Sequence, residues 1–440
     1  MNSLFEVHYW RAEASKFARQ PSMWVCLAAL LLVSMFTSIS AGLDARAWRA
    51  AAANDESLRA QRLDAVIESA HKAGASGPAL ATATYQAGRG ELGSTRMPVK
   101  DGLVLGVQSL RRLPSELKVS LENSQVDARE PGPIKNPLLS VASLPGIPAM
   151  TALLLPLVAL ILCAGLMQEE REQGRLSLLR VQSSQGIGGL MRAALAWRFI
   201  ALWMVAFVST LPAFALDPGS SPSAALGWLW SLAVFTFIWV VIGGLLSYAP
   251  ISGAASMLSA LGIWLALTFV VPAAIVQGAQ MHSPMPSRLS SIVKIRDVQQ
   301  ESEAHEQELA QTWYAKHPDI PVHLPAVWPA SFVVRALQQE QELRAELKSF
   351  EDARQAQSAF VEHWSWLSPG LNLVLAGERL AGVDVQSHLA YMHQVDSFRE
   401  RWREFLVPRV MDRKGLAPDA WSGAPCFCER VYDLRRGESR

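Results

Sequence analysis

Residues 149–180 read AMTALLLPLVALILCAGLMQEEREQGRLSLLR, and this stretch determines the fold class. Its first part, 149–168, carries no charged side chain and is about as long as a helix must be to cross the hydrocarbon core of a bilayer. Four charged residues, Glu169-Glu170-Arg171-Glu172, follow at once. The stretch therefore predicts a membrane-spanning helix that ends abruptly in a charged segment.

Further apolar runs on both sides predict additional membrane spans. No Asp, Glu, Lys or Arg occurs between Asp217 and Arg288, a distance long enough for two crossings. The turn-forming sequence YAPISG at 248–253 lies in its middle and separates the two. The five predicted transmembrane helices are 22–42, 149–168, 199–216, 224–247 and 252–275.

The first run, 22–42, could instead be the apolar core of a cleaved signal peptide. It is longer than a typical signal core, and the preceding segment 1–21 carries Lys and Arg and looks amphipathic. We therefore expect a membrane anchor that follows a cytoplasmic N-terminal amphipathic segment.

The charge of the short loops predicts the orientation. Segment 169–198 is rich in Arg, whereas the loop 217–223 has no Lys or Arg. Because short cytoplasmic loops carry an excess of Lys and Arg, 169–198 is expected in the cytoplasm. Alternation then places the N-terminus in the cytoplasm and 43–148, 276–440 and the C-terminus in the periplasm. The expected location is the bacterial inner membrane.

The two long segments outside the membrane are expected to fold as domains. Segment 43–148 opens with an Ala-rich helical stretch and continues with short alternating runs, for example 103–107, which predict a small mixed α/β extracytoplasmic domain. Segment 276–440 contains long, charged, helically periodic stretches that predict a second, helical extracytoplasmic domain. The predicted fold class is a mainly α membrane protein with about five transmembrane helices.

Composition and motifs exclude several classes of function. The chain has 440 residues, of which 50% are hydrophobic and 18% charged, and its net charge of +1 provides no basic surface for nucleic acid. It contains no G-x-x-x-x-G-K-[ST] phosphate loop, no H-E-x-x-H, no G-x-S-x-G and no zinc-spaced Cys/His set. His388 and His393 are five residues apart and do not share a helix face. We expect no catalytic, cofactor-binding or metal site in this chain.

The charged segment 169–180 is the candidate site. It leaves a membrane helix, breaks at Gly174 and restarts as a short amphipathic helix, which would suit a cytoplasmic elbow that pairs with a soluble partner. The residues alone leave open an ordinary charged flank of a membrane span. The candidate coupling residues are Glu169, Glu170, Arg171, Glu172, Gly174, Arg175, Leu176 and Leu179.

Several motifs, in chain order, resemble those of the ABC-2 type permeases in the branch with large extracytoplasmic inserts. Asn136-Pro137-Leu138 precedes the second span, and EREQGRLSLL at 170–179 follows it, similar to the family pattern E-R-E-x-G-[TS]-L-x-L-L. Arg175 stands where the family has a small hydroxyl residue. Further similar stretches are 102–110, 284–288, 316–319, 367–369 and 380–384.

The resemblance implies the permease subunit of an ATP-driven transporter, in this branch an exporter. A separate cytoplasmic ABC ATPase subunit would use the ATP and act on the 169–192 elbow, and a second permease subunit, identical or different, would complete the transporter. The family also carries a sixth membrane helix, for which 276–440 shows no apolar run.

Two other classes of function remain to be weighed against transport. In the first, a mechanical or sensory subunit would bind a periplasmic partner and move with the ATPase cycle without passing substrate. In the second, a membrane-anchored enzyme would act through an outer domain, but no acidic residue there belongs to a catalytic motif. The large outer segments favour the mechanical subunit, and the family resemblance favours transport.

Overall fold

The computed structural model describes residues 10–11, 13–73, 77–121, 145–174 and 186–427. The protein is mainly helical, and five of its described helices are long and apolar enough to cross a membrane. They confirm the predicted class and the predicted number of spans. These helices are Pro21–Lys72, Ile147–Glu172, Gly188–Leu216, Pro222–Tyr248 and Gly253–His282.

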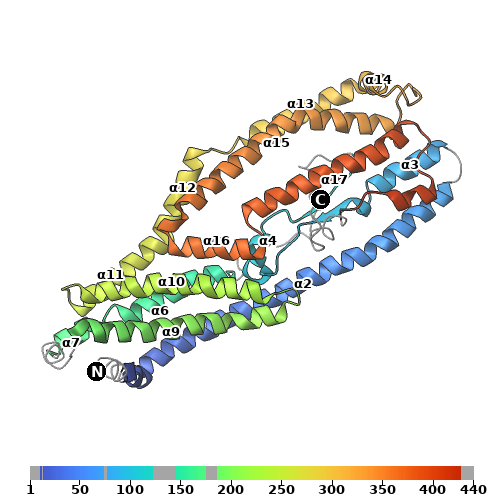
Figure 1. The fold of residues 1–440 in the computed structure, drawn as a ribbon. Helices are drawn as coiled ribbons and strands as arrows, with labels where there is room; N and C mark the ends of the chain where they lie inside the picture. Colours follow the sequence, from blue (N-terminus) through green and yellow to red (C-terminus); the bar gives the residue numbers. More distant parts are fainter. Residues whose placement is uncertain (1–9, 12, 74–76, 122–144, 175–185, 428–440) are drawn as a thin grey trace, which may run out of the picture.

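The first span belongs to a single helix, α2 (Pro21–Ala73), which is 53 residues long. The predicted boundary between membrane span and outer domain, at residues 42 and 43, lies inside this helix. Good helix formers continue beyond the apolar run, and no Gly or Pro occurs between Asp44 and Ala73 to end the helix. Figure 1 shows α2 running from the bundle far into the rest of the molecule.

The other spans form a bundle with α2, and several have internal breaks. The second span consists of α6 (Ile147–Cys163) and α7 (Leu166–Glu172), followed by α9 (Gly186–Leu216) and α10 (Pro222–Tyr248). The fifth consists of α11 (Gly253–Leu265), the π turn η3 (Ala266–Val270) and α12 (Val271–His282). The predicted turn at 248–253 lies between α10 and α11.

Close helix packing holds the bundle together. α2 packs along α9, and α10 packs along α6 and α9. A Cβ atom on Gly243 of α10 would lie 2.6 Å from the Cβ of Cys163 on α6, so no side chain fits there. Small residues allow this close approach, which supplies van der Waals contact between helices in a membrane.

Residues 77–121 and 283–427 form what we call the cap at one end of the bundle (Figure 1). Its first part contains α3 (Gly77–Gly88), α4 (Val107–Leu110) and one two-stranded antiparallel sheet, β1 (Ser94–Arg96) with β2 (Glu116–Lys118). This is less strand than the predicted mixed α/β domain implies. The second part is helical. Its helices are α13 (Arg288–Ala304), α14 (Glu306–Lys316), α15 (Ala330–Trp364), α16 (Pro369–Ala381) and α17 (Val385–Met411).

The two cap segments pack on one another instead of standing apart. The buried Trp402 indole of α17 donates to the carbonyl of Gly88 at 3.3 Å. The hydroxyl of Tyr391 on α17 lies 2.8 Å from that of Thr95 on β1. The two segments expected as separate domains, 43–148 and 276–440, thus share contacts across one core in their described parts.

Candidate functional site

The candidate elbow lies at the end of the bundle opposite the cap, close to the start of the chain's described part (Figure 1). The helix α7 ends at Glu172, and Gly174 follows with a φ angle of +69°. This is the left-handed conformation that Gly adopts at no steric cost. A Cβ atom on Gly174 would have no neighbour within 4 Å, so conformation and not space favours glycine at this position.

Two charged elbow residues are bonded to the chain's own turn between α10 and α11. The Glu172 carboxylate accepts a hydrogen bond from the backbone N–H of Gly253 at 2.8 Å, where α11 begins. The Arg171 guanidinium donates to the carbonyl of Ala249 at 3.1 Å. A carboxylate at a helix N-terminus satisfies an N–H group that has no partner within the helix. Both side chains therefore fix the position of the fourth and fifth spans relative to the second.

Uncharged groups of α7 extend the same contact. The Gln168 amide donates to the carbonyl of Leu246 at 2.9 Å, and the backbone N–H of Met167 donates to the Ser247 hydroxyl at 3.1 Å. The last turn of α10 is thus held by two further hydrogen bonds. A movement of α7 would have to break these bonds or carry α10 and α11 with it.

The N-terminal segment contacts the elbow from another side. Lys16 forms an ion pair with Glu170 at 2.9 Å, and the Trp197 indole of α9 donates to the carbonyl of Trp10 at 3.0 Å. Glu13, three residues before Lys16, is only 8% exposed. Burial raises the pKa of Glu13, while nearby Lys16 and Arg198 oppose that rise.

Arg198 is a buried charge that the sequence placed at the edge of the third span. It is 2% exposed, and it donates to the carbonyls of Leu162 at 2.9 Å and Ala194 at 2.9 Å. Because α9 already begins at Gly186, Arg198 lies well inside that helix. A buried cation needs such acceptors, since an unpaired charge in an apolar environment is costly. Arg198 ties α9 to the end of α6 beside the elbow.

The remaining candidate residues have no described side chain. Glu169 belongs to α7, but its side chain is outside the described part of the structure, and Arg175, Leu176 and Leu179 lie outside the described residues. The contacts of Arg171 and Glu172 with the 249–253 turn were not predicted from the sequence. The only signal for that turn was its Pro and Gly residues, with the N-cap Ser252, whose hydroxyl accepts from the N–H of Ala255.

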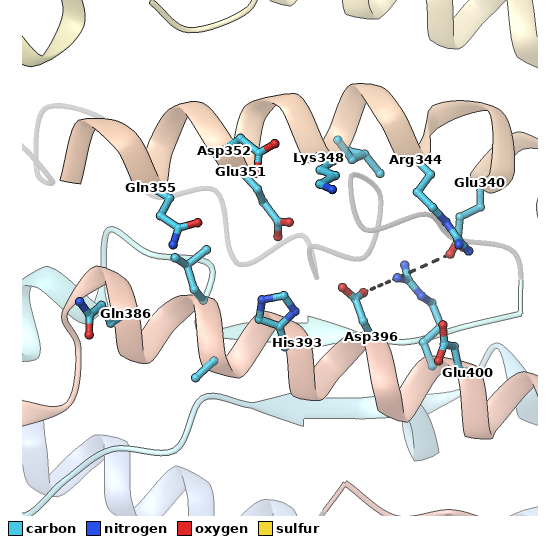
Figure 2. Close-up of a pocket in the computed structure, with 14 residues that line it drawn as sticks. Glu340, Arg344, Lys348, Glu351, Asp352, Gln355, Gln386, His393, Asp396 and Glu400 are labelled. Carbon is cyan, nitrogen blue, oxygen red and sulfur yellow. Dashed lines mark hydrogen bonds and ion pairs between the residues drawn. The ribbon is translucent and has the colours of Figure 1, made fainter. Parts of the chain in front are cut away.

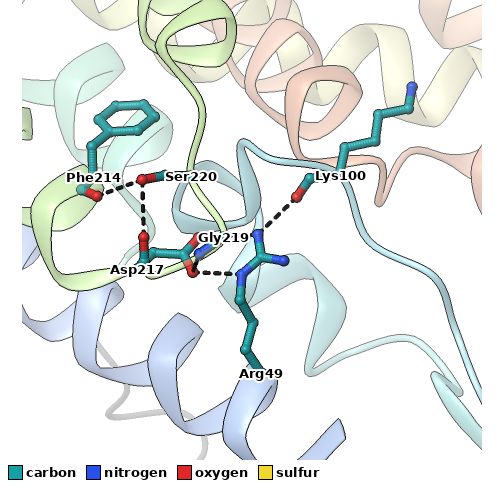
Figure 3. Close-up of polar contacts among 6 residues, drawn as sticks. All are labelled: Arg49, Lys100, Phe214, Asp217, Gly219 and Ser220. Atoms are coloured by element: carbon teal, nitrogen blue, oxygen red, sulfur yellow. Dashed lines mark hydrogen bonds and ion pairs between the residues drawn. The ribbon is translucent and has the colours of Figure 1, made fainter. Parts of the chain in front are cut away.

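A clasp between Arg49 and Asp217 fastens the opposite end of the bundle (Figure 3). The Arg49 guanidinium donates to Asp217 at 2.5 Å and 3.1 Å, and also to the carbonyl of Lys100 at 3.1 Å. The Asp217 side chain is fully buried, and it also accepts from the N–H of Gly219 at 3.1 Å. The clasp joins α2, the loop between α9 and α10, and the cap at one point.

The cap helix α16 packs directly on the bundle at the same end. A Cβ atom on Gly377 would lie 2.5 Å from Pro148 of α6, and one on Gly227 of α10 would lie 2.9 Å from Leu380. The helix α10 therefore contacts α7 of the elbow at one end and α16 at the other. The second span links the same two regions through α7 and α6.

A charged groove of about 540 Å³ lies between α15 and α17 in the cap (Figure 2). At one end, Glu340 of α15 pairs with Arg399 at 3.6 Å and with Arg403 at 2.5 Å on α17. His393 lines this groove, whereas His388 is buried on α17. Among the described residues, no group of three or more His, Cys, Asp or Glu side chains is arranged to hold a metal ion.

The comparison with known proteins concerns the cap. The sequence model of one family, described as a domain of unknown function (DUF3526), matches residues 288–428. The match covers α13 to α17 and thus includes α16 and the groove, but not the elbow. No curated protein and no solved structure matches the chain. The part of the chain after the fifth span is therefore similar to a family whose function is itself unknown.

Proposed function

We propose that this chain is the permease subunit of an ABC-2 type ATP-driven exporter in the bacterial inner membrane, with the elbow in the cytoplasm and the cap in the periplasm. A separate ABC ATPase subunit would bind and hydrolyse ATP, and this chain would bind no cofactor itself. The observation that carries the proposal is the bonding of α7 to the turn between α10 and α11. It provides a physical route by which a partner at the elbow can move membrane helices.

The route assigns different roles to the elbow residues. Arg171 and Glu172 are bonded within the chain, so they act as positioning residues that couple α7 to α10 and α11. The segment beyond Gly174 would then meet the ATPase. A push on that segment would reach α10 and α11 through four hydrogen bonds, two of which involve the charged side chains of Arg171 and Glu172.

A second permease subunit, identical or different, has an available surface on the fifth span. This span is the least buried of the five. Its exposed large apolar side chains include Leu258, Leu261 and Leu265 on α11. Such a face suits either lipid or a neighbouring helix, because both present apolar groups.

The alternative function is a mechanical or sensory subunit, which would use ATPase-driven motion to act on a periplasmic partner without moving substrate through its spans. It is favoured by α2, which runs unbroken from the bundle into the cap, and by the Arg49–Asp217 clasp at the bundle end. From Asp44 to Ala73, where it leaves the bundle, α2 contains no Gly or Pro, so this part can transmit displacement with little bending. Bundle motion would then change the position of the cap.

Reconstitution with the candidate ATPase tests both functions. The purified chain alone should hydrolyse no ATP above background, whereas the complex in proteoliposomes should. ATP-dependent movement of a compound across the vesicle membrane supports export. A distance change between spin labels on α2 and α15 during ATP turnover, without movement of any compound tested, supports the mechanical subunit. If the chain neither binds the ATPase nor changes its turnover, both functions are wrong.

A further inference from the structure

The short segment between α15 and α17 has the composition of a membrane element. Residues 364–377 read WSWLSPGLNLVLAG and contain no Asp, Glu, Lys or Arg. They comprise the turn η4 (Ser365–Leu367) and most of α16. The segment is too short to cross a bilayer as a helix, since a crossing takes about 20 residues.

Contacts with the fifth span measure how deep this segment lies. The Ser368 hydroxyl donates to the carbonyl of Leu267 at 2.9 Å. Leu267 lies 14 residues after Gly253, whose N–H is bonded to the charged Glu172 at the elbow-side face. Along a helix that rises about 1.5 Å per residue, this is about 21 Å from that face. A hydrocarbon core is about 30 Å thick, so Ser368 lies within it.

Two other helices give consistent depths for α16. A Cβ atom on Gly370 would lie 3.4 Å from Ala152, which is 17 residues before Glu169, or about 26 Å from the elbow-side face. At the other end of α16, Leu380 meets Gly227, which lies 21 residues before Tyr248, or about 32 Å from that face. The segment thus lies deepest near Ser368, and α16 leaves the core near Leu380, next to the charged Glu378 and Arg379.

The π turn of the fifth span explains why a cap residue reaches so deep. Within η3 (Ala266–Val270), the N–H of Val271 donates to Ala266 instead of Leu267, which leaves the Leu267 carbonyl without its usual helical partner. In a hydrocarbon environment no water can satisfy an unpaired carbonyl, so another part of the protein must do so. The fully buried Ser368 hydroxyl supplies that partner.

The surface of this segment that faces away from the bundle is apolar. Trp366 is 66% exposed and Leu367 is 37% exposed. η4 contacts α12, and exposed Phe269 and Val270 lie on η3 at the same level. This patch continues the exposed apolar surface of the fifth span, which meets lipid where no second subunit covers it. Trp is also favoured where the acyl chains meet the headgroups.

We propose that residues 364–377 form a re-entrant element, in which the cap dips into the membrane leaflet on its own side and Trp366 and Leu367 contact lipid acyl chains. The element serves as a sixth membrane contact without crossing the bilayer. The element anchors the cap in the leaflet independently of the five spans. This proposal does not depend on whether the chain moves a substrate.

Spin-label accessibility in lipid nanodiscs tests this placement on the full chain. Labels are placed singly at Trp366→Cys, Leu367→Cys, Leu32→Cys and Val322→Cys in a background without the four natural cysteines. Leu32 on α2 and Val322 in the cap, exposed by 68% and 62%, calibrate lipid and water respectively. Collision rates are measured with oxygen, which concentrates in acyl chains, and with a water-soluble nickel chelate.

Labels at 366 and 367 should match the label at 32, with high oxygen and low nickel accessibility. Nickel accessibility as high as at 322 would place the segment in water and overturn the proposal. Low accessibility to both reagents with spin–spin broadening would show that a second copy covers the patch, and would also overturn it. Each labelled protein must elute with the unlabelled chain in size-exclusion chromatography, and two adjacent label sites guard against misfolding of one variant.

Discussion

The Glu172 carboxylate and the backbone N–H of Gly253 are 2.8 Å apart, which joins the end of the second span to the start of the fifth. Glu172→Ala should leave the N–H without its side-chain acceptor, and loss of such a helix-terminal partner costs about 0.5–2 kcal/mol. We expect a lower unfolding temperature and weaker stimulation of the ATPase, with the ATPase still bound. Glu172→Gln keeps an oxygen acceptor and should lie between the wild type and Ala.

Gly174 should tolerate a side chain poorly because of its backbone conformation. Its φ of +69° costs a residue with a Cβ atom about 1–2 kcal/mol, and a β-branched residue suffers most. Gly174→Val should therefore move the segment that follows and reduce co-purification of the ATPase at normal abundance. Gly174→Asn, which adopts this conformation more readily, is the matched control. Equal ATPase binding by both variants and the wild type would remove the break from the coupling route.

Glu13 should make the stability of the N-terminal contact depend on pH. Burial raises the pKa of Glu13 in the folded protein above its ordinary value of 4.5, so the folded state binds this proton more tightly than the unfolded state. Stability from this group is therefore fully present below pH 4.5 and is lost as the pH rises through the folded pKa. Glu13→Gln should flatten this part of the pH profile of unfolding temperature. An unchanged profile would contradict burial of the carboxyl group.

The five spans were predictable because a long apolar run without charged residues is rarely found outside a membrane-spanning helix. The continuation of α2 beyond the membrane was not, since the change from apolar to charged residues marks the end of a span and not the end of a helix. A helical stretch was expected over 45–73, but the sequence did not show that it continues from the first span without a break. The expected boundary between residues 42 and 43 therefore marks a change from apolar to charged residues along α2 and not an end of the helix.

The elbow was predictable as a segment but not as a set of contacts. The charged run and Gly174 were visible in the sequence, whereas the partners of Arg171 and Glu172 are backbone groups about 80 residues further along. A backbone N–H or carbonyl is present at every turn and leaves no pattern of residue types. Ser368 was missed for the same reason, since its partner is a carbonyl freed by a π turn.

The stability of the folded protein should fall further when one partner of the Arg49–Asp217 pair is removed than when both charges are removed. Arg49→Ala leaves the fully buried Asp217 carboxylate without its cation, and breaking a buried pair in this way typically costs about 3–5 kcal/mol. Arg49→Ala with Asp217→Asn removes both charges and should recover much of that loss. Thermal unfolding of the two variants in one detergent measures the difference. If the double variant is no more stable than Arg49→Ala, the clasp contributes through packing and not through charge.

Ser368 should stabilise the fifth span through its hydroxyl. Ser368→Ala removes the donor and leaves the Leu267 carbonyl unsatisfied in an apolar setting, a loss of about 1–3 kcal/mol. The same hydroxyl accepts from the N–H of Leu371 at the start of α16, so Ala also removes an N-cap. Ser368→Thr keeps both functions and should retain most of the wild-type stability, whereas Ser368→Gly removes the donor but remains a tolerated N-cap residue and should lose mainly the Leu267 bond. Hydrogen exchange of the 266–271 amides separates the two effects. Faster exchange there in Ala than in Thr identifies the Leu267 bond, whereas faster exchange confined to α16 would show that only the cap of that helix was lost.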